Sequence, residues 1–183
     1  MARYVSWWRR GYLSSTGKCF DIGLTIRAAL RSFEASKQPF AGSSDPCSAG
    51  NGALMRLAPV VLFYYPDIAD VEHFAVESTR TTHAAPEALD CSRLLAHVIA
   101  KGLDGRAREE MLDASTLTLA TSSVAALASG SYVGKTESQV RGTGYAVASL
   151  EAALWCVGHT RSFEDAVLCA ANLGDDADTT AAI

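Results

Sequence analysis

The chain has 183 residues, of which 49% are hydrophobic and 20% charged, enough apolar material for one globular domain, so extensive disorder is excluded. The formal net charge is −4 and the Lys and Arg residues are scattered, which excludes the basic surface of a typical nucleic-acid-binding protein. The N-terminus, MARYVSWWRR, lacks the apolar core of a signal peptide, and no run approaches the ~18 apolar residues of a membrane span. We therefore expect a cytoplasmic protein that contacts neither nucleic acid nor membrane.

Apolar residues recur at helical spacing along most of the chain, and no segment shows the alternation of a strand. The boundary signals agree: Pro86 opens one helix, Gly102 follows it, and Ser162 with Asp165 resembles a capping box. No segment repeats at a fixed period, which argues against a solenoid. The sequence predicts one compact all-α unit over residues 1–183, with helical stripes at 22–33, 54–65, 68–75, 89–99, 147–154 and 166–170.

The cysteines are five in number, contain no CxxC pair and mostly lie in apolar helical runs. This pattern favours reduced core thiols in the cytoplasm over a disulfide framework. The five are Cys19, Cys47, Cys91, Cys156 and Cys169.

Both ends of the chain look cut. A helix that begins at Asp176 has about two turns before Ile183, which is too short to be stable unless it packs against other structure. The first residues begin in the middle of a helical pattern with no capping residue. We therefore expect a fold that is truncated at both ends.

The last twelve residues, NLGDDADTTAAI, place two carboxylates and a hydroxyl close together, at Asp176, Asp178 and Thr179. These hard oxygen donors suit Mg²⁺, which would offset the repulsion between the acids. The alternative is a solvated acidic first turn, because a helix N-terminus also favours negative charge. An EF-hand is excluded, since its loop requires a glutamate at position 12. Two acids and a threonine do not fill an octahedron, so the pattern predicts part of a metal site.

Two glycine-containing segments precede apolar helical stripes. In SAGNGALMRLAPV the residues Ser48, Gly50, Asn51 and Gly52 could bring backbone N–H groups and a helix N-terminus to a phosphate. An Asn-capped helix start is the alternative. In GTGYAVASLEAALW, Gly144 and Tyr145 lead into a helix, where the ring either lies against a base or ribose or belongs to the core. His83 lies in a loop just before the helix that begins at Pro86, where a structural or solvated histidine is the alternative.

Taken in order, SAGNGALMRLAPV, TTHAAPE, GTGYAVASLEAALW and NLGDDADTTAAI resemble the ADP-ribosylglycohydrolase family, which includes dinitrogenase reductase-activating glycohydrolase. The resemblance implies an orthogonal multi-helix fold, two Mg²⁺ or Mn²⁺ ions, and removal of ADP-ribose from protein side chains or related compounds. It implies that Asp176, Asp178 and Thr179 bind metal, whereas Asp175 replaces a residue that is commonly glycine. It also implies that the loop from Ser48 to Gly52 holds the diphosphate, and that His83, Gly144 and Tyr145 contact the ligand.

The chain lacks the Thr-Asp-Asp-Thr element that supplies the other metal ligands in this family. We therefore expect a Mg²⁺-dependent hydrolase whose activity in these 183 residues alone is weak or absent, with no catalytic residue assigned. One alternative is a module that binds ADP-ribose or a nucleotide without chemistry. The other is a helical remnant with no ligand.

Overall fold

The computed structural model describes residues 1–183 and has ten α-helices, three 3₁₀ helices and no β-strand, which confirms the all-α prediction. The helices in chain order are α1 (Ala2–Arg10), α2 (Leu24–Ser36), η1 (Pro46–Ser48), η2 (Asn51–Arg56), α3 (Ala58–Tyr64), α4 (Ile68–Arg80), α5 (Pro86–Leu103), α6 (Arg108–Leu112), α7 (Ser122–Ala128), η3 (Glu137–Gln139), α8 (Ala146–His159), α9 (Phe163–Asn172) and α10 (Ala177–Ala182).

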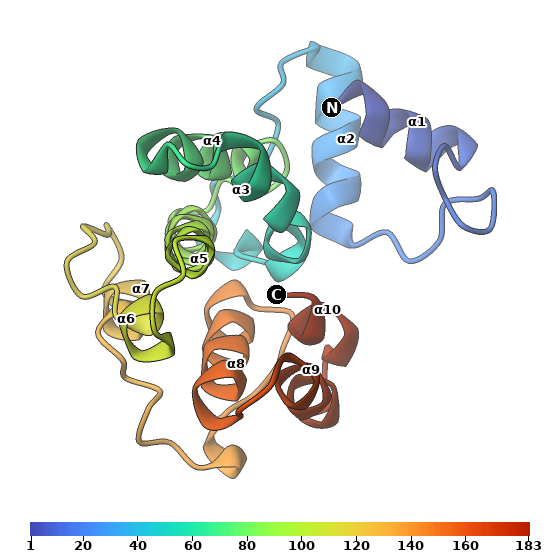
Figure 1. Cartoon of the computed structure of the whole chain (residues 1–183). Helices are drawn as coiled ribbons and strands as arrows, with labels where there is room; N and C mark the ends of the chain where they lie inside the picture. The colour runs from blue at the N-terminus through green and yellow to red at the C-terminus, as the bar shows by residue number, and fades with distance from the viewer.

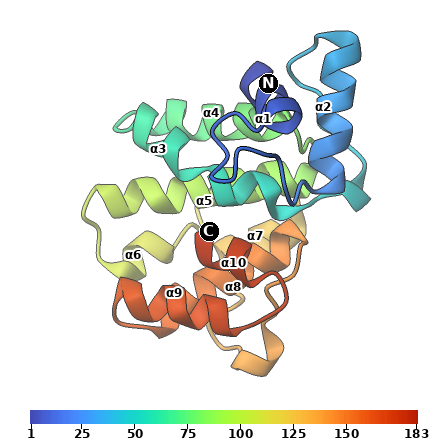
Figure 2. The same cartoon turned by 90° about the vertical axis from the view of Figure 1, so that its right-hand side faces the viewer.

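Helix α5 lies at the centre of the fold, between the α3–α4 pair on one side and α8 on the other (Figures 1 and 2). Pro86 lies in its first turn, as predicted, because the missing N–H is not needed there. Gly102 lies inside the last turn instead of after it, since Asp104 takes the C-cap position. Between α4 and α5 a buried hydrogen bond runs from Thr79 Oγ1 to Ser92 Oγ, 2.7 Å apart.

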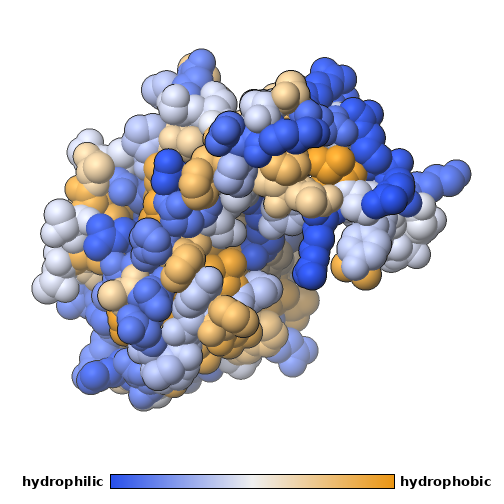
Figure 3. All heavy atoms as spheres, turned by 90° about the horizontal axis from the view of Figure 1, so that it is seen from above, coloured by the Kyte–Doolittle hydropathy of each residue, from blue (hydrophilic) through white to orange (hydrophobic).

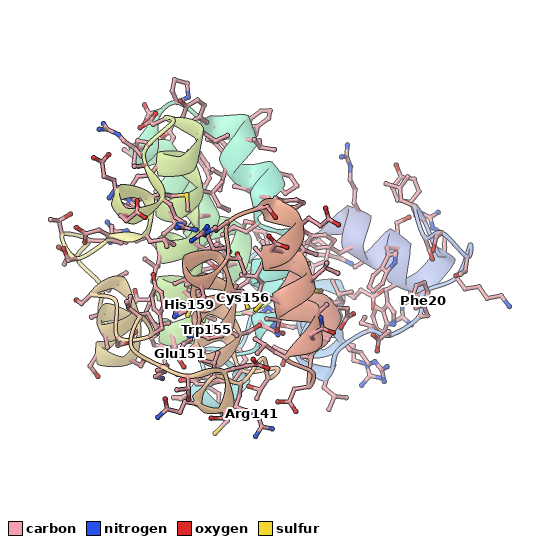
Figure 4. The ribbon with its side chains drawn as sticks, turned by 60° about the horizontal axis from the view of Figure 1, so that its bottom comes forward. Phe20, Arg141, Glu151, Trp155, Cys156 and His159 are labelled. Atoms are coloured by element: carbon pink, nitrogen blue, oxygen red, sulfur yellow. The ribbon has the colours of Figure 1, made fainter.

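Helix α8 packs against α5, α9 and α10, and most of its residues are buried. The indole Nε1 of Trp155 donates to the carbonyl of Lys135 at 2.9 Å, and the Lys135 ammonium pairs with Glu151 at 2.5 Å. These contacts attach the segment between α7 and α8 to α8, on which Figure 4 labels Glu151, Trp155 and His159.

The first turn of α9 is capped by Ser162, whose Oγ accepts from the Asp165 amide at 3.1 Å, as predicted.

The apolar stripe over 54–65 does not form one helix. The chain makes the 3₁₀ helix η2 up to Arg56 and then starts α3, with Pro59 in its first turn. Proline has no N–H to donate and its ring clashes with the preceding turn of an α-helix, so the helix begins anew at this point.

Helix α1 agrees with the helical pattern expected for the first residues, and it has no buried residue. An ion pair between Arg9 and Glu34 of α2, 2.6 Å apart, holds it in place. In Figure 3 the N-terminal part of the chain protrudes from the body of the molecule. Leu13, just after α1, is 84% exposed. No helix in the structure combines the length with the apolarity that crossing a bilayer requires.

Candidate functional site

Two of the glycine segments identified in the sequence pair through their backbones. The Asn51 amide donates to the Gly144 carbonyl at 3.0 Å, and the Ala146 amide donates to the Ala49 carbonyl at 2.9 Å. These two bonds fix the start of η2 against the start of α8, although the two segments lie more than 90 residues apart in the chain.

The C-terminal acidic segment joins the same junction. The Asp176 amide donates to the Gly142 carbonyl at 2.7 Å. A Cβ atom on Gly142 would lie 2.6 Å from Oγ1 of Thr180, so only glycine allows this close approach. The segments 48–52, 141–146 and 174–180 therefore meet at one place, which we call the three-segment junction.

The backbone of Asp175 turns its side chain away from Asp176. Its φ is +55°, in the left-handed region where glycine is favoured, which explains why a glycine would suit this position. Its carboxylate accepts from the Arg141 guanidinium at 2.8 and 3.2 Å, and this hydrogen-bonded pair lowers the pKa of Asp175. Asp175 thus forms a surface ion pair and does not line the site.

A pocket of about 330 Å³ opens at the three-segment junction. We call it the main pocket. Eight of the ten residues predicted for the site line it: Gly50, Asn51, Gly52, His83, Gly144, Asp176, Asp178 and Thr179.

The Asn51 side chain does not cap a helix. Gly50 is the N-cap residue of η2, so the interpretation of Asn51 as a helix cap is wrong. Its Nδ2 instead lies 2.7 Å from Oδ2 of Asp176, and 3.2 Å from both Ser149 Oγ and the Thr143 carbonyl, as a donor to all three. Asn51 is only 7% exposed, so its amide orients the Asp176 carboxylate from inside the protein.

The predicted metal ligands share one wall of the main pocket. Asp176 is the N-cap residue of α10, Asp178 lies exposed in the first turn, and Thr179 is buried with Oγ1 3.7 Å from the Met55 sulfur. Carboxylate and hydroxyl oxygens fit Mg²⁺ as ligands. No group of three or more His, Cys, Asp or Glu side chains is close enough to hold an ion by itself. The donors therefore suit a cation but supply only part of its coordination.

His83 is buried, with 2% of its surface exposed, so the interpretation as a solvated loop histidine is wrong. Its Nδ1 lies 2.8 Å from Oγ1 of Thr82, and the same Oγ1 accepts a hydrogen bond from the Arg56 guanidinium at 2.8 Å. Burial, and then the Arg56 charge, lowers the pKa of His83 to about 4. At neutral pH the ring is therefore uncharged.

Ser48 and Tyr145 line a neighbouring pocket of about 590 Å³, which shares Gly50 and Gly144 with the main pocket. The Ser48 hydroxyl donates to the Asp45 carbonyl at 2.6 Å, so it stabilises the turn before η2. The Ser48 hydroxyl proton is therefore used in a hydrogen bond within its own loop.

Tyr145 is 41% exposed, so the alternative of a core tyrosine is wrong. Its hydroxyl donates to Glu87 at 2.5 Å, which fixes the ring at the edge of the neighbouring pocket. Burial of the hydroxyl, and then this hydrogen bond, raises the pKa of Tyr145.

Part of the main pocket was not predicted from the sequence. The segment that leads into α2 also lines it, through Asp21, Gly23 and Thr25, as does Met55 of η2. Asp21 has a φ of +50°, which is unusual for a residue other than glycine and often marks a functional position. The only signal in the sequence was an acid two residues before a glycine at the start of a helix, which is too common to stand out.

The comparisons with known proteins agree with one another. The family model described as ADP-ribosylglycohydrolase matches residues 1–183. The chain is 40% identical over 178 residues to "ADP-ribosylarginine hydrolase Tri1" of Pseudomonas putida (strain GB-1), which covers 97% of this chain and 48% of that protein. It is 36% identical over 180 residues to the protein of the same name in Serratia proteamaculans (strain 568), which covers 98% of this chain and 49% of that protein.

A solved structure described as "ADP-ribosylglycohydrolase-related protein complex" superposes with a TM-score of 0.78 and 37% identity. The match covers 87% of this chain and 55% of that chain. The chain spans about half the length of the curated relatives it matches.

Proposed function

Because the chain belongs to the ADP-ribosylglycohydrolase family, we propose that it takes part in hydrolysis of the glycosidic bond that joins ADP-ribose to a protein side chain. The observation that carries the proposal is the main pocket, which a glycine loop, a buried neutral histidine and three aspartates line. The two curated relatives are named for ADP-ribosylarginine, so an arginine adduct is the substrate to test first.

In this proposal the backbone of the loop from Gly50 to Gly52 receives the diphosphate. His83 donates a hydrogen bond to the ligand, and Tyr145 borders the ribose or adenine side from the neighbouring pocket. The glycines favour this role, because a loop without side chains lets backbone N–H groups approach an anion. Binding energy at the diphosphate would orient the reacting bond.

Asp176, Asp178 and Thr179 are the residues that would hold Mg²⁺ or Mn²⁺ in the proposed site. Such an ion, when bound, polarises hydroxyls and water. Asn51 supports this role, because it engages Oδ2 of Asp176 and so fixes the direction in which the other carboxylate oxygen points. A hydrogen bond of this kind commonly orients a metal-binding side chain.

We expect hydrolysis by these 183 residues alone to be weak or absent, since the proposed ligands Asp176, Asp178 and Thr179 are fewer than the six oxygens that Mg²⁺ prefers, and no group of three or more His, Cys, Asp or Glu side chains is placed to hold an ion. A module that binds ADP-ribose without chemistry is therefore the second candidate, which the intact glycine loop and His83 favour. All five cysteines are free thiols, which supports the cytoplasm as the compartment.

The test is calorimetric titration of ADP-ribose into the full chain, with Mg²⁺ or with a chelator, alongside release of ADP-ribose from an ADP-ribosylated arginine peptide. We expect Mg²⁺ to increase ADP-ribose affinity in the wild type and in Asp175→Asn, but not in Asp176→Asn. The two substitutions make the same change of charge at adjacent positions, and only Asp176 lines the pocket.

Three results would contradict parts of this proposal. Affinity that does not depend on Mg²⁺ favours the binding module over the hydrolase. No affinity for ADP-ribose in either condition contradicts both. Turnover by the chain alone comparable to that of the relatives would show that the expected loss of activity is wrong.

A further inference from the structure

We propose that Thr82, held by Arg56, sets His83 in the tautomer that carries its hydrogen on Nε2, so that the ring presents a neutral N–H donor to the glycine loop. Thr82 and Arg56 are then positioning residues that act through His83. The identity of the ligand oxygen that accepts from Nε2 rests on the proposed function, whereas the tautomer itself does not.

The first step is the direction of the Arg56–Thr82 hydrogen bond. The Arg56 guanidinium lies 2.8 Å from Oγ1 of Thr82. A guanidinium has five N–H donors and no acceptor, so the Thr82 oxygen must accept this bond. Arg56 also lies with its Cζ 5.0 Å from the centre of the Tyr4 ring, and this contact holds the guanidinium from its other side.

The second step follows from the single hydroxyl proton of Thr82. Thr82 has no exposed surface, and the only other partner of its Oγ1 is Nδ1 of His83, at 2.8 Å. If Nδ1 carried the hydrogen and donated it, the Thr82 proton would have no acceptor inside the protein. A buried polar group without a hydrogen-bond partner is strongly unfavourable, because it has lost its bonds to water. Thr82 must therefore donate to Nδ1, which places the ring hydrogen on Nε2.

The Nε2 atom of His83 lies beside the glycine loop. A Cβ atom on Gly50 would lie 3.3 Å from His83 Nε2, and one on Gly52 would lie 3.5 Å from it. His83 lines the main pocket, and its Nε2 makes no hydrogen bond within the protein. A buried side chain thus aims one unpartnered N–H group into the pocket beside the glycine loop.

This geometry suits an oxygen acceptor of the ligand, on the diphosphate or on a ribose. The ring remains neutral near pH 7, since burial and the Arg56 charge both oppose protonation. A neutral donor binds an oxygen without bringing a second positive charge next to Arg56.

The experiment is a ¹H–¹⁵N correlation spectrum of the histidine rings in the full chain without ligand, with the His83 signals assigned from their loss in His83→Gln. We expect Nε2 protonated and Nδ1 unprotonated in the wild type and in Thr82→Ser, which keeps the hydroxyl. In Thr82→Val, which has the same shape but no hydroxyl, we expect a lower fraction of the Nε2–H tautomer. Protonated Nδ1 in the wild type would overturn the proposal, and this reading depends on the folded His83→Gln variant for assignment but on no Thr82 variant.

A second measurement is ADP-ribose affinity. We expect the dissociation constant to rise about tenfold in Thr82→Val and to stay within twofold of the wild type in Thr82→Ser, with both variants checked for an unchanged circular dichroism spectrum. A folded Thr82→Val that keeps both the wild-type tautomer and the wild-type affinity would contradict the role of Thr82. The expected tautomers in a chain that binds no ADP-ribose would support this inference while contradicting the proposed function.

Discussion

Replacing Asn51 with aspartate tests whether one amide orients the Asp176 carboxylate. The new carboxylate oxygen would lie where Nδ2 now lies, 2.7 Å from Oδ2 of Asp176. Two unit charges at this distance repel by about 6 kcal/mol at an effective dielectric constant of 20. Binding one proton between them is cheaper, because protonating an ordinary aspartate, with a pKa near 3.9, costs about 4 kcal/mol at pH 7. The cost of protonating one of the two carboxylates therefore sets the upper limit on the loss of stability from their repulsion.

The free energy of unfolding of Asn51→Asp should accordingly be about 4 kcal/mol below that of the wild type at pH 7. The deficit should shrink by about 1.4 kcal/mol for each unit of pH lowered, because the shared proton becomes easier to bind. Urea denaturation at pH 7, 6 and 5, with wild type and variant measured side by side, gives this difference directly. Other groups that titrate in both proteins cancel from it.

Asn51→Ala is the matched control, since it removes the same hydrogen bonds without adding a charge. Its loss should be about 1.5–3 kcal/mol, the usual range for a hydrogen bond to a charged group, and should depend little on pH. If Asn51→Asp showed a deficit as independent of pH as that of Asn51→Ala, the two carboxylates would not be in contact, and the orienting role of Asn51 would be wrong.

Three further changes probe other parts of the site and fold. Because the pKa of His83 is lowered to about 4, the unfolded chain binds a proton below pH 6.5 that the folded chain does not bind. The free energy of unfolding should therefore fall by about 3 kcal/mol between pH 6.5 and pH 4. In urea titrations His83→Gln should lack this pH-dependent loss. Gly142→Ala should lower the melting temperature and weaken ADP-ribose binding, because its Cβ would lie 2.6 Å from Thr180 Oγ1; unchanged values in calorimetry would show that the junction adapts. Ser162→Ala should cost about 1 kcal/mol by loss of the cap on α9, measured by urea denaturation, with ADP-ribose affinity unchanged.

The long helices could be predicted from the sequence because their periodicity reflects one buried face. The stripe at 89–99 lies within α5 and that at 147–154 within α8, both of which pack on several neighbours. The prediction of one helix over 54–65 failed, because the apolar spacing continued across a residue that interrupts a helix. Pro59 divides the stripe at 54–65, and the apolar pattern alone gave no weight to the N–H group that proline lacks. Helix α1 has no buried face, so the helical pattern of the first residues indicated a helix there but not a buried stripe.

Eight of the ten residues predicted from the sequence line the main pocket, whereas the hydrogen-bond partners of each side chain could not be predicted. Glycine, asparagine and aspartate types marked the segments that meet in the main pocket. The acceptors of the Asn51 amide lie 92 to 125 residues away in the chain, so no local pattern could show that it binds Asp176 instead of capping η2. The same holds for Tyr145, whose partner Glu87 is 58 residues distant.

The position of Asn51 also bears on the coupling between ADP-ribose binding at the glycine loop and cation binding at the acidic segment of the proposed site. Its backbone amide holds the Gly144 segment and its side chain holds Asp176, so one residue contacts both the glycine loops and the acidic segment. A cation that shifts the Asp176 carboxylate would therefore alter the side-chain hydrogen bond of the residue whose backbone amide holds the Gly144 segment. By thermodynamic linkage, any effect of Mg²⁺ on ADP-ribose affinity must equal the effect of ADP-ribose on Mg²⁺ affinity. Asn51→Ala keeps Asp176, Asp178 and Thr179 and the backbone N–H groups of the glycine loop, and it removes the side-chain hydrogen bonds to Asp176, Ser149 and the Thr143 carbonyl. The coupling, more than either affinity alone, is therefore what the substitution should diminish.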